Sequence, residues 1–322
     1  MGTLRRQSIV SDRRWRSYAA AIVASILWGS LYPAGKPAIA VVGPMQVALC
    51  RAILACLTMG LLVAMRGDAR TFGRHLRKRW RGILGLALTS FFGSSLLAML
   101  ALGLLPASII GLLNNTSPLW LAIGTALFFP PRRPLILIIG SLAAFGGVGL
   151  IFFPDLLHGS LAVPPSMNPL GIIFALGGSC VIATSTVLGR NVMRGGDPVA
   201  ISALASGAAV PLLGALVLLN GGPGPILTAP LEVKLLLLYV GIGCTACNFT
   251  LWFYALQHLP AAQAAAFQYL IPPISVLLSA LTLGEPLTLA LVVGGSLIVC
   301  GLVATQGAGT RAVRAPAIQP LA

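Results

Sequence analysis

The sequence predicts an all-α membrane protein in which ten transmembrane helices form two inverted five-helix repeats. Three observations favour this fold class: an apolar composition, ten apolar segments of membrane-spanning length, and an internal repeat. Of the 322 residues, 57% are hydrophobic and 8% are charged, whereas soluble domains carry about 25% charged residues. No polar stretch is long enough for a separate soluble domain, so the composition indicates a chain embedded in the bilayer.

Ten apolar segments are long enough to cross a bilayer, since a membrane helix needs about 20 apolar residues. They cover residues 18–42, 45–66, 81–104, 106–129, 134–153, 169–190, 199–220, 233–257, 260–283 and 286–306. The first is longer than the apolar core of a signal peptide, so we expect no cleavage there. The expected organisation is a basic tail (1–17), a first repeat (18–153), an extracytoplasmic linker (154–168), a second repeat (169–306) and a second tail (307–322).

One pattern occurs twice in the chain, at an offset of 154 residues. The matching positions are Leu105-Pro106-Ala107 with Leu259-Pro260-Ala261, Pro118 with Pro272, Gly140 with Gly294, and Gly147 with Gly301. Internal repeats of apolar helices are the usual architecture of secondary transporters, and the substrate site lies where the repeats meet. The repeat therefore indicates a class of function as well as a fold.

The distribution of Lys and Arg predicts the orientation in the membrane. Basic residues occupy the two tails and every second loop, while the remaining loops hold at most Lys234. They are Arg5, Arg6, Arg13, Arg14, Arg16, Arg66, Arg70, Arg74, Arg77, Lys78, Arg79, Arg81, Arg132, Arg133, Arg190, Arg194, Arg311 and Arg314. Because cytoplasmic loops carry this excess, both termini are expected in the cytoplasm, in a bacterial-type inner membrane. Five helices per repeat is an odd number, so the second repeat must be inverted.

The net charge of +15 and the six cysteines are both ordinary features of a membrane protein. The basic residues lie in short loops between apolar segments, so the expected partner is the lipid bilayer and no nucleic acid. Cys244 and Cys247 form a CxxC pair inside an apolar segment without a second pair, which favours small apolar packing residues over zinc or redox chemistry. We expect no metal and no cofactor.

Several short motifs resemble a known family. Trp28-Gly29 lies in the first segment, Leu-Pro-Ala opens the fourth and ninth, and residues 284–288 (Gly-Glu-Pro-Leu-Thr) open the tenth. In this order the chain resembles EamA-type permeases of the drug/metabolite transporter superfamily over residues 18–306, and within them the YddG-type aromatic amino-acid exporters. The first repeat departs from the pattern, because it reads Pro-Pro-Arg-Arg at 130–133, where the second repeat has Gly284-Glu285.

The resemblance implies export of small metabolites by alternating access, in particular of aromatic or other amino acids. Permeases of this superfamily move amino acids, nucleosides, sugar phosphates or drugs, so the fold alone leaves the substrate open. One alternative is a proton-coupled exporter of drugs or nucleosides. Another is a membrane receptor that transports nothing and needs no central polar cavity.

Acidic residues are absent from the expected centre of the bilayer. They are Asp12, Asp68, Asp155, Asp197, Glu232 and Glu285, all in tails, loops or at segment edges. Proton-driven transporters commonly use a buried carboxylate as a relay, so we expect a facilitator or an exchanger unless Lys36 or a histidine carries the proton. The chain has no Ser/His/Asp set and no glycine-rich phosphate loop, so we expect no enzyme.

Two cations and one helix face suggest a substrate site. Lys36 and Arg51 lie inside apolar segments, where each could hold a carboxylate or extend to the outer headgroups. Trp28, Tyr32 and Lys36 recur every four residues and share one helix face. That face suits an aromatic or zwitterionic solute, or alternatively forms an interfacial aromatic belt. Pro33, with Gly35 and Pro37, is expected to interrupt this helix.

Two prolines place amide side chains at membrane depth. Pro118 and Pro272 each free the carbonyl four residues earlier, which belongs to Asn114 and Gln268. Inverted symmetry should bring these two residues together, either around an aqueous cavity or in a helix-to-helix bond. The candidate substrate-binding residues are Trp28, Tyr32, Lys36, Arg51, Asn114, Asn115, Trp252, Gln268 and Tyr269. The repeated glycines should allow close packing of the fifth and tenth segments, within the fold or in a possible homodimer.

Overall fold

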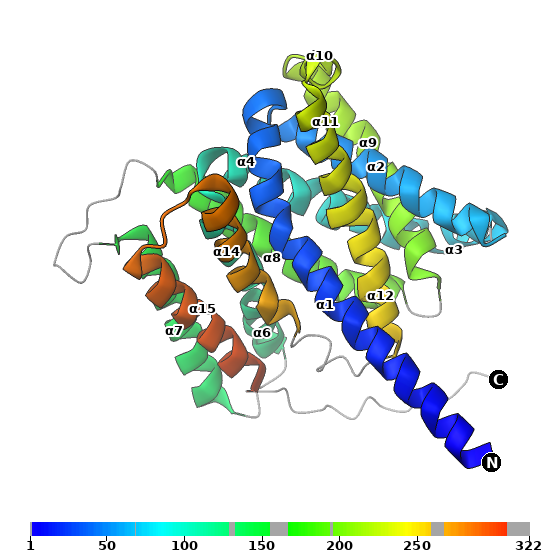
Figure 1. Cartoon of the computed structure of the whole chain (residues 1–322), viewed down its shortest axis with the longest axis horizontal. Coiled ribbons are helices and arrows are strands. Elements are labelled where there is room, and N and C mark those ends of the chain that lie inside the picture. Colours follow the sequence, from blue (N-terminus) through cyan, green and yellow to red (C-terminus); the bar gives the residue numbers. More distant parts are fainter. Residues whose placement is uncertain are drawn as a thin grey trace.

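The computed structural model of the protein describes residues 2–67, 69–128, 133–154, 167–193, 196–258 and 267–307. Within these ranges the chain is helical apart from short connections, and none of the described residues forms a strand (Figure 1). The all-α fold class is therefore confirmed.

The helices follow one another in the order that the apolar segments predict. The first half contains α1 (Gly2–Val42), α2 (Pro44–Met65), α3 (Ala69–Leu86), η1 (Ala87–Ser94), α4 (Ser95–Leu104), α5 (Ala107–Leu113), η2 (Asn114–Thr116), α6 (Ser117–Phe128) and α7 (Pro134–Phe152). The second half contains α8 (Pro169–Val192), α9 (Pro198–Leu219), α10 (Gly224–Thr228), α11 (Leu231–Leu238), η4 (Tyr239–Cys247), α12 (Asn248–His258), η5 (Gln268–Leu270), α14 (Ile271–Leu283) and α15 (Leu289–Gly307). Here η1 and η4 are π-helices, while η2 and η5 are 3₁₀-turns.

Seven helical stretches of the described residues are long and apolar enough to cross a membrane. They are Trp15–Val42, Pro44–Met65, Phe72–Leu104, Pro134–Ile151, Pro169–Gly189, Pro198–Leu219 and Leu231–Trp252. Gln268–Leu283 and Leu289–Ala304 are shorter apolar helices, and α5, η2 and α6 follow one another where the fourth segment was expected. The start of the ninth segment, residues 260–266, lies outside the described residues. The protein is a multi-pass membrane protein.

The first helix is not interrupted as the sequence analysis predicted. α1 is a single α-helix that contains both Pro33 and Pro37. A proline removes one backbone donor, but unwinding the helix inside the membrane would leave several more backbone groups without partners. The continuous helix therefore costs less than the break that was expected. A bend does occur in α3 at Arg79, where φ is −132° and ψ is 17°.

Interruptions of helical geometry recur at equivalent places in the two halves. The two 3₁₀-turns begin at Asn114 and Gln268, the residues whose carbonyls Pro118 and Pro272 free. The π-helices η1 and η4 also occupy matching positions, and α2 and α9 have bounds that differ by the repeat offset at both ends. The sequence repeat is thus a structural repeat in its irregular parts as well as in its helices.

The two halves are interleaved rather than side by side. α1 packs against α12 and α14 of the second half, while α8 packs against α4 and α6 of the first. Equivalent helices also pair directly, because α2 contacts α9 and α7 contacts α15. In Figure 1, α7 and α15 lie together on one side of the molecule and α2 and α9 on the other.

The repeated glycines show that equivalent helices run in opposite directions. A side chain at Gly294 would collide with the carbonyl of Gly147, and one at Gly301 would collide with Gly140. Residue numbers rise along α7 as they fall along the facing α15, so the two helices are antiparallel. Glycine permits this approach because it lacks a Cβ atom. The inverted arrangement is therefore visible in a contact within one chain.

Charged side chains hold the break between α4 and α5, next to Pro106. Lys36 Nζ donates to the carbonyls of Leu102 and Leu105, at 2.6 Å in each case. On the other side of the break, Glu285 accepts from the backbone amides of Ala107 at 2.6 Å and Ser108 at 2.9 Å. A cation at a helix C-terminus and an anion at an N-terminus both complement the helix dipole. Lys36 therefore has a packing role, which sequence reasoning did not foresee.

Gly294→Ala should lower the thermal stability of the purified protein. The new Cβ would lie 2.7 Å from the carbonyl oxygen of Gly147, and overpacking of this kind costs about 1–3 kcal/mol. Gly146→Ala is the matched control, because no atom lies within 4 Å of a Cβ at that position. Equal melting temperatures for the two variants would show that α7 and α15 do not pack through these glycines.

Glu285→Ala should also destabilise the fold, because it removes the acceptors of two backbone amides. Losing a charged cap of this kind costs about 1–3 kcal/mol. Glu232→Ala is the control, since Glu232 is an exposed residue in the first turn of α11. Melting temperatures in detergent give the comparison, and a loss confined to the Glu232 variant would contradict the capping role of Glu285.

Candidate functional site

Three polar side chains are buried together in the interior. Tyr32 of α1 is 4% exposed, Asn114 of η2 is 7% exposed and Arg51 of α2 is 9% exposed. Asn114 Nδ2 donates to the hydroxyl of Tyr32, and Tyr32 in turn lies within electrostatic range of Arg51. We call Tyr32, Arg51 and Asn114 the polar centre. The sequence analysis had selected all three residues, and the structure places them together.

Two hydroxyl groups hold the guanidinium of Arg51. Its Nε donates to Thr245 Oγ1 at 3.3 Å, and its Nη1 donates to Ser95 Oγ at 3.0 Å. The hydroxyl of Thr245 itself donates to the carbonyl of Val240 at 2.8 Å, so its oxygen remains an acceptor for Arg51. Thr245 lies in the π-helix η4 and Ser95 directly follows the π-helix η1. The neutral ligands of this buried cation therefore come from η4 and from the first residue after η1.

The amide of Asn114 is only half satisfied. Its nitrogen donates to Tyr32, but its oxygen Oδ1 is buried and has no hydrogen-bond partner among the described residues. A Cβ at Gly178 of α8 would lie 3.2 Å from this oxygen, so the glycine leaves space beside it. The polar centre thus combines a cation that is bonded to neutral groups with an acceptor that lacks a donor.

Four aromatic side chains pack against one another across α1, η1 and α12. The ring of Trp28 is 5.7 Å from that of Phe249 and 5.6 Å from that of Trp252, and Phe91 is 5.6 Å from Phe249. We call these four residues the aromatic layer. Edge and tilted contacts at these distances are favourable for aromatic rings. The layer links α1 to the η4–α12 span and to η1.

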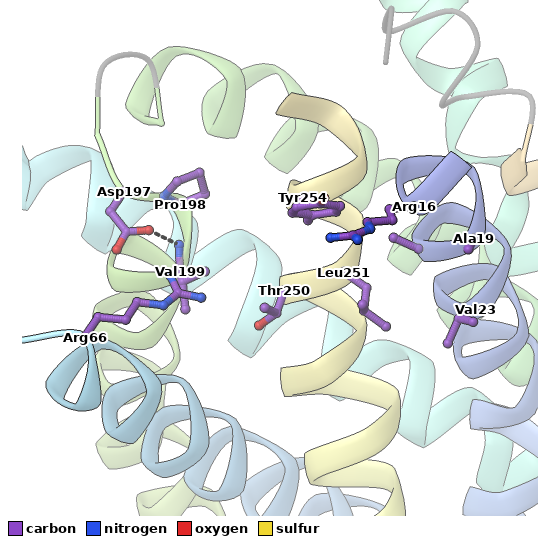
Figure 2. Close-up of a pocket in the computed structure, with 11 residues that line it drawn as sticks. Arg16, Ala19, Val23, Arg66, Asp197, Pro198, Val199, Thr250, Leu251 and Tyr254 are labelled. Carbon is purple, nitrogen blue, oxygen red and sulfur yellow. Dashed lines mark hydrogen bonds between the residues drawn. The ribbon is translucent and has the colours of Figure 1, made fainter. Parts of the chain in front are cut away.

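A groove of about 530 Å³ opens at one end of the bundle (Figure 2). Arg16 and Val23 of α1 line it on one side and Tyr254 of α12 lies next to them, with Arg16 extending toward Tyr254. Arg66, at the end of α2, and Asp197, which caps α9, line the opposite side. Asp197 Oδ1 accepts from the backbone amide of Val199 at 2.9 Å.

The groove, the aromatic layer and the polar centre follow one another into the protein. Along α1 the order is Val23, Trp28 and Tyr32, and the α12–η4 span gives the parallel order of Tyr254, then the aromatic layer, then Thr245. Along α2, Arg66 lines the groove and Arg51 belongs to the polar centre. The three layers thus have the same order along α1 and along the α12–η4 span, and α2 gives the same order for the groove and the polar centre.

The other candidate residues have local partners. Asn115 donates to the carbonyl of Gly111 at 2.6 Å, and the hydroxyl of Tyr269 donates to that of Leu302 at 3.3 Å. Gln268 begins η5 and is partly buried. Asn114 donates to Tyr32, and no hydrogen bond among the described residues joins it to Gln268. The expected meeting of the two amides around a cavity stays a prediction.

Sequence reasoning missed several parts of this arrangement. It did not single out Ser95 and Thr245, whose hydroxyls resemble many others in apolar segments, nor Phe91 and Phe249. Three hydroxyl or indole groups on α6, η2 and α8 form a further network, in which Ser179 accepts from Trp120 at 2.7 Å and contacts Thr116 at 2.9 Å. Among the described residues there is no group of three His, Cys, Asp or Glu side chains that could hold a metal ion.

Known proteins share this architecture. The model of the EamA-like transporter family matches residues 15–153 and 169–305. An uncharacterized transporter of Bacillus subtilis, YvbV, is 27% identical over 286 residues, covering 86% of this chain and 87% of the relative. A probable terminal-alkyne amino-acid exporter of Streptantibioticus cattleyicolor is 28% identical over 289 residues, covering 88% of this chain and 91% of the relative.

A solved crystal structure of another protein has the same fold, with a TM-score of 0.61, 21% identity, and coverage of 89% of this chain and 95% of that chain. An uncharacterized transporter of Archaeoglobus fulgidus is 23% identical over 280 residues and matches 85% of this chain and 93% of the relative. The family model matches both halves and almost the whole described chain. The chain therefore belongs to the EamA-like transporter family.

Proposed function

We propose that this transporter exports amino acids, with Arg51 binding the carboxylate of the solute and Asn114 binding its ammonium group. The observation that carries the proposal is the buried guanidinium of Arg51, whose hydrogen-bond partners among the described residues are two neutral hydroxyls. A carboxylate from the solute would supply the missing negative charge. The polar centre would then be complementary to a zwitterion.

The energetic argument begins with the cost of a buried charge. Removing a guanidinium from water costs several kcal/mol, which neutral hydroxyls recover only in part. Arg has five donors in a planar fork that matches a carboxylate, and the hydroxyls of Ser95 and Thr245 engage two of its nitrogens. A cation that is retained inside a membrane protein without a paired anion is a functional site by default.

The acceptor side of the polar centre fits an ammonium group. A buried acceptor without a donor costs about 1–3 kcal/mol, and the Oδ1 atom of Asn114 is such an acceptor. Tyr32 bonds Asn114 and interacts electrostatically with Arg51, which supports assigning both features to one site. A zwitterionic solute would satisfy the cation and the acceptor at once.

The aromatic layer favours a solute with an aromatic or apolar side chain. Trp28 lies one helical turn before Tyr32 on α1, and its ring is 5.6 Å from that of Trp252. Aromatic pairs add about 0.5–1.5 kcal/mol to simple burial. This agrees with a YddG-type substrate range, and the relative in Streptantibioticus cattleyicolor is named a probable amino-acid exporter. We propose that this chain, like the protein named there, exports amino acids.

We propose a facilitator or an exchanger that works by alternating access. Of the acidic residues in the described chain, Glu285 bonds two backbone amides and Asp197 caps α9. Neither belongs to the polar centre, where a proton relay would be needed. The inverted repeats supply two equivalent arrangements of the helices, and exchange between them would open the site to each side in turn.

The direction of transport depends on the orientation of the protein in the membrane, which we propose from the positions of its basic residues. The groove is lined by Arg16 and Arg66, and basic residues are concentrated on the cytoplasmic side of membrane proteins. Both termini and the groove would then face the cytoplasm, with the 154–168 linker outside. The membrane would be the inner membrane of a bacterial-type cell.

Arg51→Gln should weaken transport of phenylalanine, because it removes the charge that binds the carboxylate. Losing a hydrogen-bonded charge pair corresponds to about a tenfold or greater rise in apparent KM. Uptake of labelled L-phenylalanine into proteoliposomes without an ion gradient measures it. Phenethylamine, which lacks the carboxylate, is the matched solute, and the variant should lose the preference for phenylalanine over phenethylamine.

Arg77→Gln is the control variant, since Arg77 is an exposed residue of α3 away from the polar centre. Arg51→Lys should recover part of the affinity, because it keeps the charge but loses the fork geometry. A normal KM for phenylalanine in Arg51→Gln, with a lowered melting temperature, would mean that Arg51 only joins α2 to its neighbours.

Labelling of introduced cysteines should establish the proposed orientation. A membrane-impermeant maleimide added to intact cells should modify Thr228→Cys, which lies at the exposed end of α10, and should leave Arg77→Cys unmodified. The unchanged chain, with its six cysteines, gives the background. The opposite labelling pattern would mean that the protein has the reverse orientation in the membrane.

A further inference from the structure

We infer that the groove between α1, α12, α2 and α9 is a second binding site, which binds the carboxylate of the amino acid before the solute reaches Arg51. Arg16 and Arg66 would bind the carboxylate of the solute there, and the apolar walls would hold its side chain. The inference rests on the proposed function, because it assigns the same class of solute to a separate place on its path.

The charge on the groove favours an anion. Its lining includes the guanidinium groups of Arg16 and Arg66 and the carboxylate of Asp197. One oxygen of that carboxylate already accepts from the amide of Val199, where it caps α9. The groove therefore carries a net positive charge on residues from opposite walls. The two guanidinium groups would attract the carboxylate end of a zwitterion at close range.

The walls and size suit a small amphipathic solute. Between the charged residues the lining is mostly apolar and includes Ala20, Val23, Val199 and Leu251. The volume of about 530 Å³ lies within the range of about 300–1,000 Å³ that is usual for small-molecule sites. Figure 2 shows Arg16 on α1 and Arg66 on α2 at opposite sides of this space, with Thr250 and Leu251 between them.

The groove and the polar centre are too far apart for one small solute to occupy both. Arg66 and Arg51 lie on the same stretch of chain, and fifteen residues of helix correspond to about 22 Å. The aromatic layer, with Trp28, Phe249 and Trp252, lies between the two depths. An amino acid must therefore leave the first arginine before it reaches the second. The two sites would be occupied in sequence, and the aromatic layer would separate them.

The groove site predicts a defect on one side of the membrane. Arg66→Gln and Arg16→Gln should each raise the apparent KM for labelled L-phenylalanine about threefold to tenfold in everted vesicles. In right-side-out vesicles the same variants should have an unchanged KM, because the groove is not the entrance from that side. Arg77→Gln should be normal in both preparations.

Salt gives a readout that a structural defect would not change. Screening shortens the range of surface charge from about 10 Å at 0.1 M to about 3 Å at 1 M. The difference between Arg66→Gln and the unchanged protein should therefore shrink as the salt concentration rises. A difference that persists at 1 M salt, or that is equal in both vesicle orientations, would overturn the inference.

The same anionic chemistry could come from a lipid headgroup, and reconstitution distinguishes the two sources. In vesicles of phosphatidylcholine alone, the effect of Arg66→Gln should remain if the groove binds the solute. An effect that appears only when phosphatidylglycerol is added would assign the groove to lipid and overturn the inference. Arg51→Gln separates this result from the proposed function: if that variant is impaired while both groove variants are normal, only the groove site fails.

Discussion

Buried backbone groups that lose their helical partners must find others, and the rest of this structure depends on how the chain supplies them. At the break before α5 the partners are side chains: Lys36 covers two carbonyls and Glu285 covers two amides, each from a different helix. In η4 the hydroxyl of Thr245 donates to the carbonyl of Val240. In both places the partner comes from a side chain, either of a neighbouring helix or of the irregular turn itself. These repairs fix the positions of the helices that carry the site.

The arrangement of the helices follows the inverted repeat, whereas the residues of the polar centre do not. Pairs of equivalent helices meet across the inverted repeat, and irregular turns recur at matching positions. The polar centre follows a different rule: the repeat equivalent of Tyr32 is Thr186 and that of Arg51 is Ala205. One half therefore supplies all three residues of the polar centre, and the other supplies chiefly Thr245 and the facing aromatic rings. A symmetric framework can exchange two arrangements while a single charged group interacts with the solute.

Much of the fold could be predicted from the sequence, because the length of an apolar segment and the position of a proline act locally. The 3₁₀-turns at Asn114 and Gln268 follow from the prolines four residues later. The contacts within the candidate site were harder to predict from the sequence. The amide of Asn114 bonds Tyr32 because of the way α1 lies against η2, and nothing in either segment encodes that rotation. Likewise, Lys36 could be recognised as a cation inside an apolar segment, but its carbonyl partners depend on which helix ends beside it.

The interleaving of the two halves also affects how the chain is made. α1 is the first helix to emerge during synthesis, yet it packs mainly against helices of the second half. Ser25, for example, donates to the carbonyl of Phe267, which is 242 residues further along the chain. Contacts with such a separation form late and slowly, because a long loop must close before they contribute. During much of synthesis, α1 therefore lacks the second-half helices against which it packs in the finished protein. The lipid and the insertion machinery must accommodate it, and a chain cut between the halves would leave α1 and α8 each without its main support.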